Sequence, residues 1–360
     1  MEGGNLIAAG TYGCAFTPPL LCKDKRKVQA GLVGKITVKD DADQEILIAN
    51  KIRTIPLSKN YFLLPLPESC EPAPRSEQSD TNLKLGKCGP IESKDHPLPY
   101  EQTQQIFTPF GGKAFYGILK ASSFNPKTFD LPSFMQHMLE AGSTLLVAGV
   151  CHFDLHPGNI LLDTKGVPRL IDFGMSFISK TISTDILNQR WKELAFSGLM
   201  PEILNSECPE VTIMNAVFNN AYTNENAIQK AMIGKPMVSD TETYFGISKQ
   251  QQINSFTEFW STSGVIQKKD VVGFWRLYWS KFDAWAIGCI FMSILKRLMF
   301  YKDTVKNQLV LATIKGLTDV NPRKRLDCIE ALSLFDPNNE WIKQFGQKWL
   351  DLRRKDRAKI

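Results

Sequence analysis

The chain has 360 residues, of which 43% are apolar and 22% charged, and its formal net charge is +6. That length and apolar content can supply the core of two domains or of one large two-lobed unit, which excludes a disordered or fibrous protein. The excess positive charge is modest for this length, so we do not expect nucleic acid to be a partner.

Three features of the sequence indicate in which cellular compartment the protein is located. Residues 1–5 contain no basic stretch followed by an apolar run, so we expect no signal peptide. The longest apolar stretch, Ala284–Leu295, is too short to cross a bilayer and predicts a buried core helix rather than a membrane span. The eight cysteines include no CxxC pair, which favours reduced thiols and a cytoplasmic location.

The first hundred residues begin with sheet-like patterns. Residues 6–39 alternate short apolar runs with glycine-rich turns and predict β-strands, and residues 41–53 predict a helix. The stretch at about 66–100 is rich in proline, serine and charge and has little periodicity. It predicts a long surface loop inserted between regular elements.

Strand patterns return and then give way to helices. Residues 105–110 and 114–119 predict strands, and a helical pattern runs from Pro132 onwards. A β-rich front followed by a helix-rich back indicates an α+β fold with two unequal lobes. We place the small β-rich lobe at 1–112 and the larger, mostly helical lobe at 113–360.

The strongest functional signal is the run His-Phe-Asp-Leu-His-Pro-Gly-Asn at residues 152–159, followed by Asp-Phe-Gly at residues 172–174. Phosphoryl transfer from a nucleotide needs one carboxylate beside the attacking hydroxyl, and an amide oxygen and a second carboxylate for metal ions. Asp154, Asn159 and Asp172 are the residue types for these three roles. The apolar hairpin pattern between the two motifs would bring both carboxylates to the same end of a strand pair.

These two motifs resemble, in order and spacing, the catalytic loop H-R-D-L-x-x-x-N and the metal-binding turn D-F-G of the protein kinase family. The resemblance implies the two-lobed kinase fold, ATP with Mg²⁺ (or Mn²⁺) as cofactors, and a protein as phosphate acceptor. It also implies that Asp154 accepts the hydroxyl proton and that Asn159 and Asp172 bind metal.

Residues 8–16 resemble the glycine-rich loop of the same family, in which backbone amides approach the phosphates where side chains are absent. Gly10 and Gly13 take the second and third glycine positions. Ala8 stands at the first glycine position and Ala15 at the usual valine, so the match is partial. We expect Ala8, Gly10 and Gly13 to lie against the nucleotide.

The resemblance also supplies the other nucleotide contacts. Lys35, in the strand-like run 32–36, corresponds to the lysine that binds the phosphates, and Glu45 is the candidate for its helical partner. Residues 107–112, with Phe110, fall where the family's hinge joins the lobes and offers backbone groups to adenine.

Three further motifs resemble the helical lobe of protein kinases. Asp283 opens a D-x-W motif whose aspartate holds the backbone of the catalytic loop, and Arg325 stands in a late motif of the form D-P-x-x-R. Met-Pro-Glu, ending at Glu202, resembles the A-P-E that closes the activation segment, here 172–202. The resemblance then implies a buried ion pair between Glu202 and Arg325.

Two stretches lie outside the resemblance. An insertion at about 205–269 separates Glu202 from Asp283, and the sequence leaves open whether it binds a partner or pads the lobe. The C-terminal residues 348–359 concentrate basic side chains. We interpret this tail as a solvated helix end.

Two residues of the catalytic loop depart from the family pattern. Phe153 stands where many protein kinases carry the arginine that receives the activation-loop phosphate, so activity need not depend on that phosphorylation. His156 replaces a lysine near the transferred phosphate, and a neutral histidine would stabilise charge less well there. Histidine at this place also occurs in small-molecule kinases.

The predicted function is ATP-dependent phosphoryl transfer to Ser/Thr hydroxyls of protein substrates. Two alternatives stay open: a small-molecule or lipid kinase of the same fold, which His156 favours, and a pseudokinase scaffold, which Ala8 and Ala15 favour. Residues 10–22 and 152–159 also resemble the kinases of large nucleocytoplasmic DNA viruses. A viral kinase would be located in the host cytoplasm and in the virion.

Overall fold

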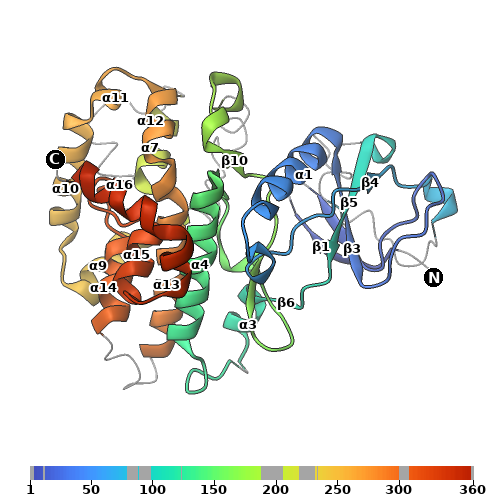
Figure 1. Cartoon of the computed structure of the whole chain (residues 1–360), viewed down its shortest axis with the longest axis horizontal. Coiled ribbons are helices and arrows are strands. Elements are labelled where there is room, and N and C mark those ends of the chain that lie inside the picture. The colour runs from blue at the N-terminus through green and yellow to red at the C-terminus, as the bar shows by residue number, and fades with distance from the viewer. Residues whose placement is uncertain are drawn as a thin grey trace. The chain divides into compact units, whose positions relative to one another are not determined.

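The computed structural model describes residues 4–10, 13–78, 88, 99–122, 124–187, 206–218, 232, 234–299 and 308–357 (Figure 1). The chain forms two compact units. The N-terminal unit consists of Met1–Lys113 with Leu161–Gly174, and the C-terminal unit of Ala114–Ile160 with Met175–Ile360. Secondary structure is mixed, and its sheet-rich part is N-terminal, in agreement with the predicted α+β class.

The N-terminal unit is built on a five-stranded sheet of order β1-β2-β3-β5-β4 with antiparallel neighbours. Its elements are β1 (Leu6–Ala9), β2 (Cys14–Phe16), β3 (Leu32–Val38), α1 (Lys39–Arg53), η1 (Ser58–Asn60), β4 (Ser69–Cys70), η2 (Arg75–Glu77), η4 (Tyr100–Gln102), β5 (Thr103–Pro109), β8 (Ile160–Leu162) and β9 (Pro168–Leu170). The predicted strands within 6–39 and 105–110 and the predicted helix at 41–53 are confirmed.

Helix α1 lies against β3 and β5 of the sheet (Figure 1). Its buried residues recur at the three- and four-residue spacing of one helical face: Ala42, Glu45, Ile48, Ala49 and Ile52. Four of the five are apolar, whereas Glu45 is a carboxylate. A charged side chain on a buried face indicates a specific partner, since an unpaired buried charge is strongly unfavourable.

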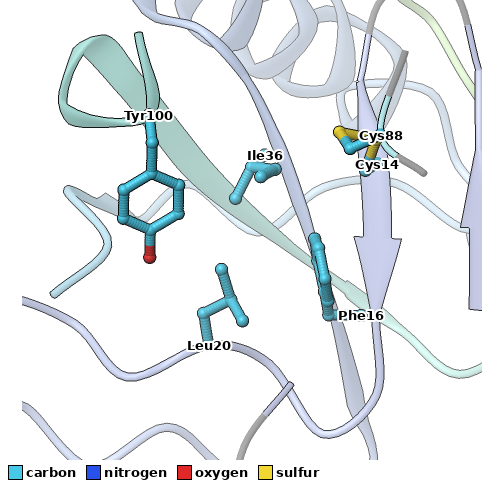
Figure 2. Packing of buried hydrophobic residues seen from close by; sticks show 6 residues of the cluster. All are labelled: Cys14, Phe16, Leu20, Ile36, Cys88 and Tyr100. Carbon is cyan, nitrogen blue, oxygen red and sulfur yellow. A yellow bond between two sulfur atoms is a disulfide. The ribbon is translucent and has the colours of Figure 1, made fainter. Parts of the chain in front are cut away.

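Two disulfides correct the expectation that all cysteines are reduced. Cys14 of β2 is bonded to Cys88, and Cys22 is bonded to Cys70 of β4. Figure 2 shows the first within a cluster of buried residues: Cys14, Phe16, Leu20, Ile36, Cys88 and Tyr100. The other four cysteines are buried thiols. The pairs are 74 and 48 residues apart, so sheet formation rather than local sequence brings them together.

The described part of the predicted surface loop, residues 66–78, is tied to the sheet, so the loop prediction is wrong for it. β4 pairs with β5, and Gln78 is 4% exposed. The Gln78 amide accepts a hydrogen bond from the Leu21 backbone N–H at 2.9 Å and donates one to the Leu21 carbonyl at 3.0 Å. A buried amide that pairs with the backbone in this way acts as an additional strand contact.

The C-terminal unit is mostly helical. Its elements are α3 (Phe115–Lys120), α4 (Leu131–Ala148), β7 (Val150–Cys151), η5 (Pro157–Asn159), β10 (Phe177–Ile178), η6 (Ser179–Thr181), α7 (Pro209–Phe218), α9 (Pro236–Phe245), α10 (Lys249–Thr262), α11 (Gly264–Gln267), α12 (Val271–Tyr278), η7 (Trp279–Lys281), α13 (Phe282–Met299), α14 (Gln308–Leu317), α15 (Cys328–Phe335), the π-helix η8 (Ile342–Gly346) and α16 (Gln347–Arg357). β6 (Lys113–Ala114) lies at the junction of the units.

Helix α13 forms the centre of this unit, with α4 and α14 against it (Figure 1). Its stretch Ala284–Leu295 is buried at nearly every position, which confirms the predicted core helix. The predicted helix from Pro132 is α4, which begins with an Asp130 cap on the Ser133 amide. Among the described residues, no helix is long and apolar enough to cross a membrane.

The predicted strand at 114–119 is wrong, because residues 115–120 form helix α3. Phe115 is fully buried, and its ring centroid lies 4.9 Å from that of Phe134 and 6.0 Å from that of Phe129. Tertiary packing of one aromatic side chain here outweighs the strand propensity of the local sequence.

Candidate active site

In the N-terminal unit, Lys35, Glu45 and Asp172 form a charged cluster. Lys35 lies on β3, and its ammonium contacts the Glu45 carboxylate of α1 and lies 2.8 Å from Asp172 Oδ1. Lys35 and Glu45 side chains are 18% and 3% exposed, whereas that of Asp172 is 43% exposed. The predicted pairing of Lys35 with Glu45 is thus present, and Asp172 is the member of the cluster that is open to solvent.

The electrostatics of the cluster favour a protonated lysine. Burial alone would lower the pKa of Lys35, but the carboxylates of Asp172 and Glu45 outweigh this and raise it. Burial raises the pKa of Glu45 to about 7, with the Lys35 charge opposing the rise. The cluster therefore places a permanent cation beside an accessible carboxylate, as binding of a metal–polyphosphate complex requires.

The glycine-rich hairpin borders this cluster. β1 and β2 are antiparallel with Ala8 opposite Ala15, and the Gly10 N–H donates to the Gly13 carbonyl at 2.9 Å. A Cβ at residue 13 would lie 2.5 Å from a backbone oxygen of β3 and 3.2 Å from Lys35 Cε. Glycine is therefore required at 13 for the hairpin to approach Lys35. The tip, residues 11–12, lies outside the described residues.

The predicted hinge follows β5. Phe110 is 57% exposed, and its N–H donates to the Gly31 carbonyl at 2.9 Å. Gly112 has φ +104, a region that L side chains rarely adopt, and a Cβ there would meet the Leu162 carbonyl at 2.1 Å. The backbone turn thus depends on glycine, whereas contact of Phe110 with a nucleotide stays a prediction.

In the C-terminal unit, the catalytic loop places Asp154 and Asn159 within hydrogen-bonding distance of each other. The Asn159 amide donates to the Asp154 carbonyl at 2.9 Å and to Asp154 Oδ2 at 3.1 Å. Both bonds use Asn159 Nδ2, which leaves its amide oxygen for another partner. His156 Nδ1 accepts from the Gly158 N–H at 3.1 Å, and His156 Nε2 lies 3.8 Å from Asp154 Oδ2. The Asn159 amide and the His156 ring therefore both lie beside the Asp154 carboxylate.

The buried carboxylate of Asp283 accepts two backbone hydrogen bonds from the catalytic loop. Asp283 Oδ2 accepts from the His152 N–H at 2.7 Å, and Asp283 Oδ1 accepts from the Phe153 N–H at 2.9 Å. Burial raises the pKa of Asp283, and the two amides oppose the rise. This confirms the predicted role of Asp283 as the residue that holds the catalytic-loop backbone.

Phe153 is strained and heavily packed. Its φ of 68° is an outlier for a bulky residue, and such strain persists only where surrounding contacts impose it. Its ring centroid lies 4.9 Å from Trp275 of α12, 5.7 Å from Phe177 of β10 and 6.0 Å from Phe282 of α13. An aromatic cluster thus joins the catalytic loop to the start of the predicted activation segment.

A small cavity of about 50 Å³ opens beside Asp154 within the C-terminal unit. Its lining is mostly apolar and comes from the catalytic loop, residues 206–208 and α13: Phe153, Asp154, Met175, Ser206, Glu207, Cys208, Phe282, Asp283 and Ala286. Residues 206–208 were not singled out in the sequence. They lie beside the carboxylate that is expected to act on the acceptor.

The buried ion pair corrects the predicted partner of Arg325. Both Arg325 and Glu210 are fully buried, and two guanidinium nitrogens bond the two Glu210 oxygens at 2.6 and 2.9 Å. Glu202, the predicted partner, lies outside the described residues. Cys-Pro-Glu at 208–210 contains the same Pro-Glu dipeptide as Met-Pro-Glu at 200–202. This second dipeptide was the signal in the sequence that could have identified Glu210. The segment that precedes α7 is therefore anchored eight residues later than predicted.

The donor set fits a magnesium ion. Mg²⁺ prefers oxygen ligands and binds through one or two side chains together with phosphate oxygens and water. Asp172 offers a solvent-accessible carboxylate and Asn159 an amide oxygen. No group of three His, Cys, Asp or Glu side chains that could hold a metal occurs in the described part of the chain. The two predicted ligands lie in different units, each in the local geometry given above.

Comparison with known proteins points to the same chemistry. Residues 115–180 match the Phosphotransferase enzyme family (APH), a span that contains α4 and the catalytic loop. A stretch of 112 residues is 30% identical to a "Putative cyclin-dependent serine/threonine-protein kinase" of Dictyostelium discoideum. That match covers 29% of this chain and 16% of the relative. Both descriptions name phosphotransferases, which supports phosphoryl transfer by a kinase.

Removal of either member of the buried ion pair should destabilise the protein. Arg325→Met leaves the Glu210 charge buried without its partner, so we expect a loss of about 3–5 kcal/mol in the free energy of unfolding. The double variant Arg325→Met/Glu210→Met should lose less than the sum of the single losses. Glu210→Gln and Glu202→Gln are the matched test and control, and urea unfolding measures the stability of every variant, including both single methionine variants. A loss for Glu202→Gln as large as that for Glu210→Gln would contradict the assignment.

Proposed function

We propose that the chain transfers the γ-phosphoryl group of ATP to Ser/Thr hydroxyls of protein substrates. The observation that carries the proposal is the Lys35 ammonium held between Glu45 and Asp172. A buried cation fixed on a strand, with a glycine hairpin beside it, suits the phosphates of a nucleotide. Mg²⁺, when bound, would neutralise the polyphosphate charge.

The residues divide the reaction between them. Lys35 and the backbone at Gly10 and Gly13 would hold the phosphates, and Asp172 and Asn159 would hold the metal. The acceptor oxygen forms a bond to the γ-phosphorus as the bond from that phosphorus to the bridging oxygen breaks, so ADP leaves. Asp154 takes the proton of the acceptor hydroxyl.

His156 would act on the position of Asp154 and on the charge that develops on the phosphoryl group. Because His156 Nδ1 accepts the Gly158 N–H, the neutral tautomer carries its proton on Nε2, the atom that faces Asp154. The neutral ring can donate a hydrogen bond there. It provides less electrostatic stabilisation than the lysine that the family resemblance leads one to expect.

A protein acceptor is favoured by the helical unit. The motifs at Glu202, Asp283 and Arg325 are the features by which the sequence resembles protein kinases rather than other kinases. The Asp283 contacts to the catalytic loop and the bond of Arg325 to Glu210 support this resemblance. The second candidate is transfer to a small molecule, which His156 and the match to the Phosphotransferase enzyme family favour. The two differ in the acceptor and share the chemistry.

Transfer of label from γ-³²P-ATP tests the proposal. Wild type, Asp154→Ala, Asp172→Ala and Lys35→Met are incubated with Mg²⁺ and a basic protein acceptor, and with a panel of small amines and alcohols. We expect label on serine and threonine with the wild type and a loss of at least about 10²-fold in each variant, because each removes a charged group from the reaction. Label on a small molecule alone would favour the second candidate, and no label despite Mg·ATP binding would contradict both.

We also propose that activity does not depend on phosphorylation of the activation segment. The Phe153 ring, packed with Phe177 and Trp275, takes the place where an arginine would bind a phosphate. Arg276 of α12 adds a hydrogen bond of 2.8 Å to the Ile182 carbonyl. Apolar packing, the pairing of β10 with β7 and the Arg276 contact thus hold the described start of the segment without an added phosphate.

Phosphatase treatment tests this second proposal. The protein is freed of phosphate, checked by mass spectrometry, and assayed with ATP over a single turnover so that it cannot modify itself first. We expect the same rate before and after treatment, and a rate about tenfold lower for Trp275→Ala, which loosens the aromatic cluster. A rate that collapses on dephosphorylation and returns on phosphorylation would overturn the proposal.

A further inference from the structure

Lys235 is a buried lysine for which the reaction described above has no use. It precedes α9, within the stretch predicted as an insertion, and is 4% exposed. Burial lowers the pKa of its ammonium group, which measures how unfavourable the position is for a cation. A methionine of similar length would fill the volume without that penalty, so packing alone does not explain a lysine here.

Its ammonium reaches the wall of the cavity beside Asp154. Lys235 Nζ donates to the Glu207 carbonyl at 2.8 Å, and Glu207 lies between Ser206 and Cys208, which line the same cavity. The Glu207 side chain accepts a hydrogen bond from Thr212 of α7. Lys235 therefore bonds the backbone of the wall itself.

Helix α9, which begins directly after Lys235, is itself anchored. Asp240 of α9 lies 2.9 and 3.0 Å from the Lys296 ammonium of α13, and the Gln252 amide of α10 donates to the Val238 carbonyl at 2.9 Å. Downstream of the wall, Arg325 holds Glu210. Residues 206–208 are thus held at one end by the buried ion pair and in their middle by Lys235.

We propose that Lys235 is a positioning residue that fixes residues 206–208 as the acceptor-facing wall beside Asp154, so that the inserted α9 sets the fit of the phosphate acceptor. This rests on the proposed function. It assigns the insertion a role in acceptor binding and none in nucleotide binding. A misplacement of about 1 Å at such a wall can change a rate about 10²-fold.

The test compares Lys235→Met with Lys315→Met, which removes an exposed lysine from α14 of the same unit. Transfer to a basic protein gives the KM of the acceptor. Hydrolysis of Mg·ATP without that protein gives the KM of ATP and the rate at which water, instead of the protein, accepts the phosphoryl group. We expect Lys235→Met to raise the acceptor KM about tenfold, with the KM of ATP and the hydrolysis rate unchanged. Lys315→Met should equal the wild type.

Parallel losses in acceptor transfer and ATP hydrolysis, or an unchanged acceptor KM, would overturn the inference. If circular dichroism shows Lys235→Met to be unfolded, Asp240→Asn frees α9 at the protein surface, and it should raise the acceptor KM in the same direction by a smaller factor. Failure of the proposed function can be told apart from failure of this inference, because the wild type itself would then transfer no label. That outcome overturns the proposed function and the role of Lys235 together.

Discussion

The buried carboxylate of Asp283 is the constraint on which the C-terminal half of the site depends. It stands in the first turn of the core helix α13 and accepts the amides of His152 and Phe153. Removing two amides and one carboxylate from water is favourable only because each satisfies the other. The position of Asp154, the next residue, is thereby fixed relative to the buried core helix of its unit.

The N-terminal half of the site depends on the balance of charge between one lysine and two carboxylates. Glu45 lies on the buried face of α1, where its charge is tolerated because Lys35 reaches it from β3. Asp172 contacts the same ammonium from a more exposed position. In the proposed reaction Asp172 would hold the metal, and Glu45 would keep Lys35 in place for the phosphates. The sheet and the helix thus present a lysine whose charge is already balanced by two carboxylates.

Much of this site could be predicted from the sequence, since its signals are local. The spacing of Asp154, Asn159 and Asp172 and the buried helix at Ala284–Leu295 follow from short patterns. The pairing of Lys35 with Glu45 follows from the resemblance to protein kinases. The strand predicted at 114–119 failed because Phe115 packs with residues that local propensity does not include.

The remaining misses concern pairing between distant residues. Two Pro-Glu dipeptides lie eight residues apart in the sequence, and only the three-dimensional structure identifies Glu210 as a partner of Arg325. The disulfides Cys14–Cys88 and Cys22–Cys70 join residues that are 74 and 48 positions apart, which no local pattern pairs. Lys235 belongs to no sequence motif, and its contact with the Glu207 carbonyl could be identified only from the structure.

The most direct test of the account is the turnover of Asp283→Asn. The amide of asparagine can accept one of the two loop N–H groups, but its NH₂ cannot accept the other, so the loop loses one anchor. The account predicts that kcat for phosphoryl transfer falls by about 10- to 100-fold, while calorimetry finds the affinity for Mg·ATP largely unchanged. A correctly folded variant with the kcat of the wild type would contradict it.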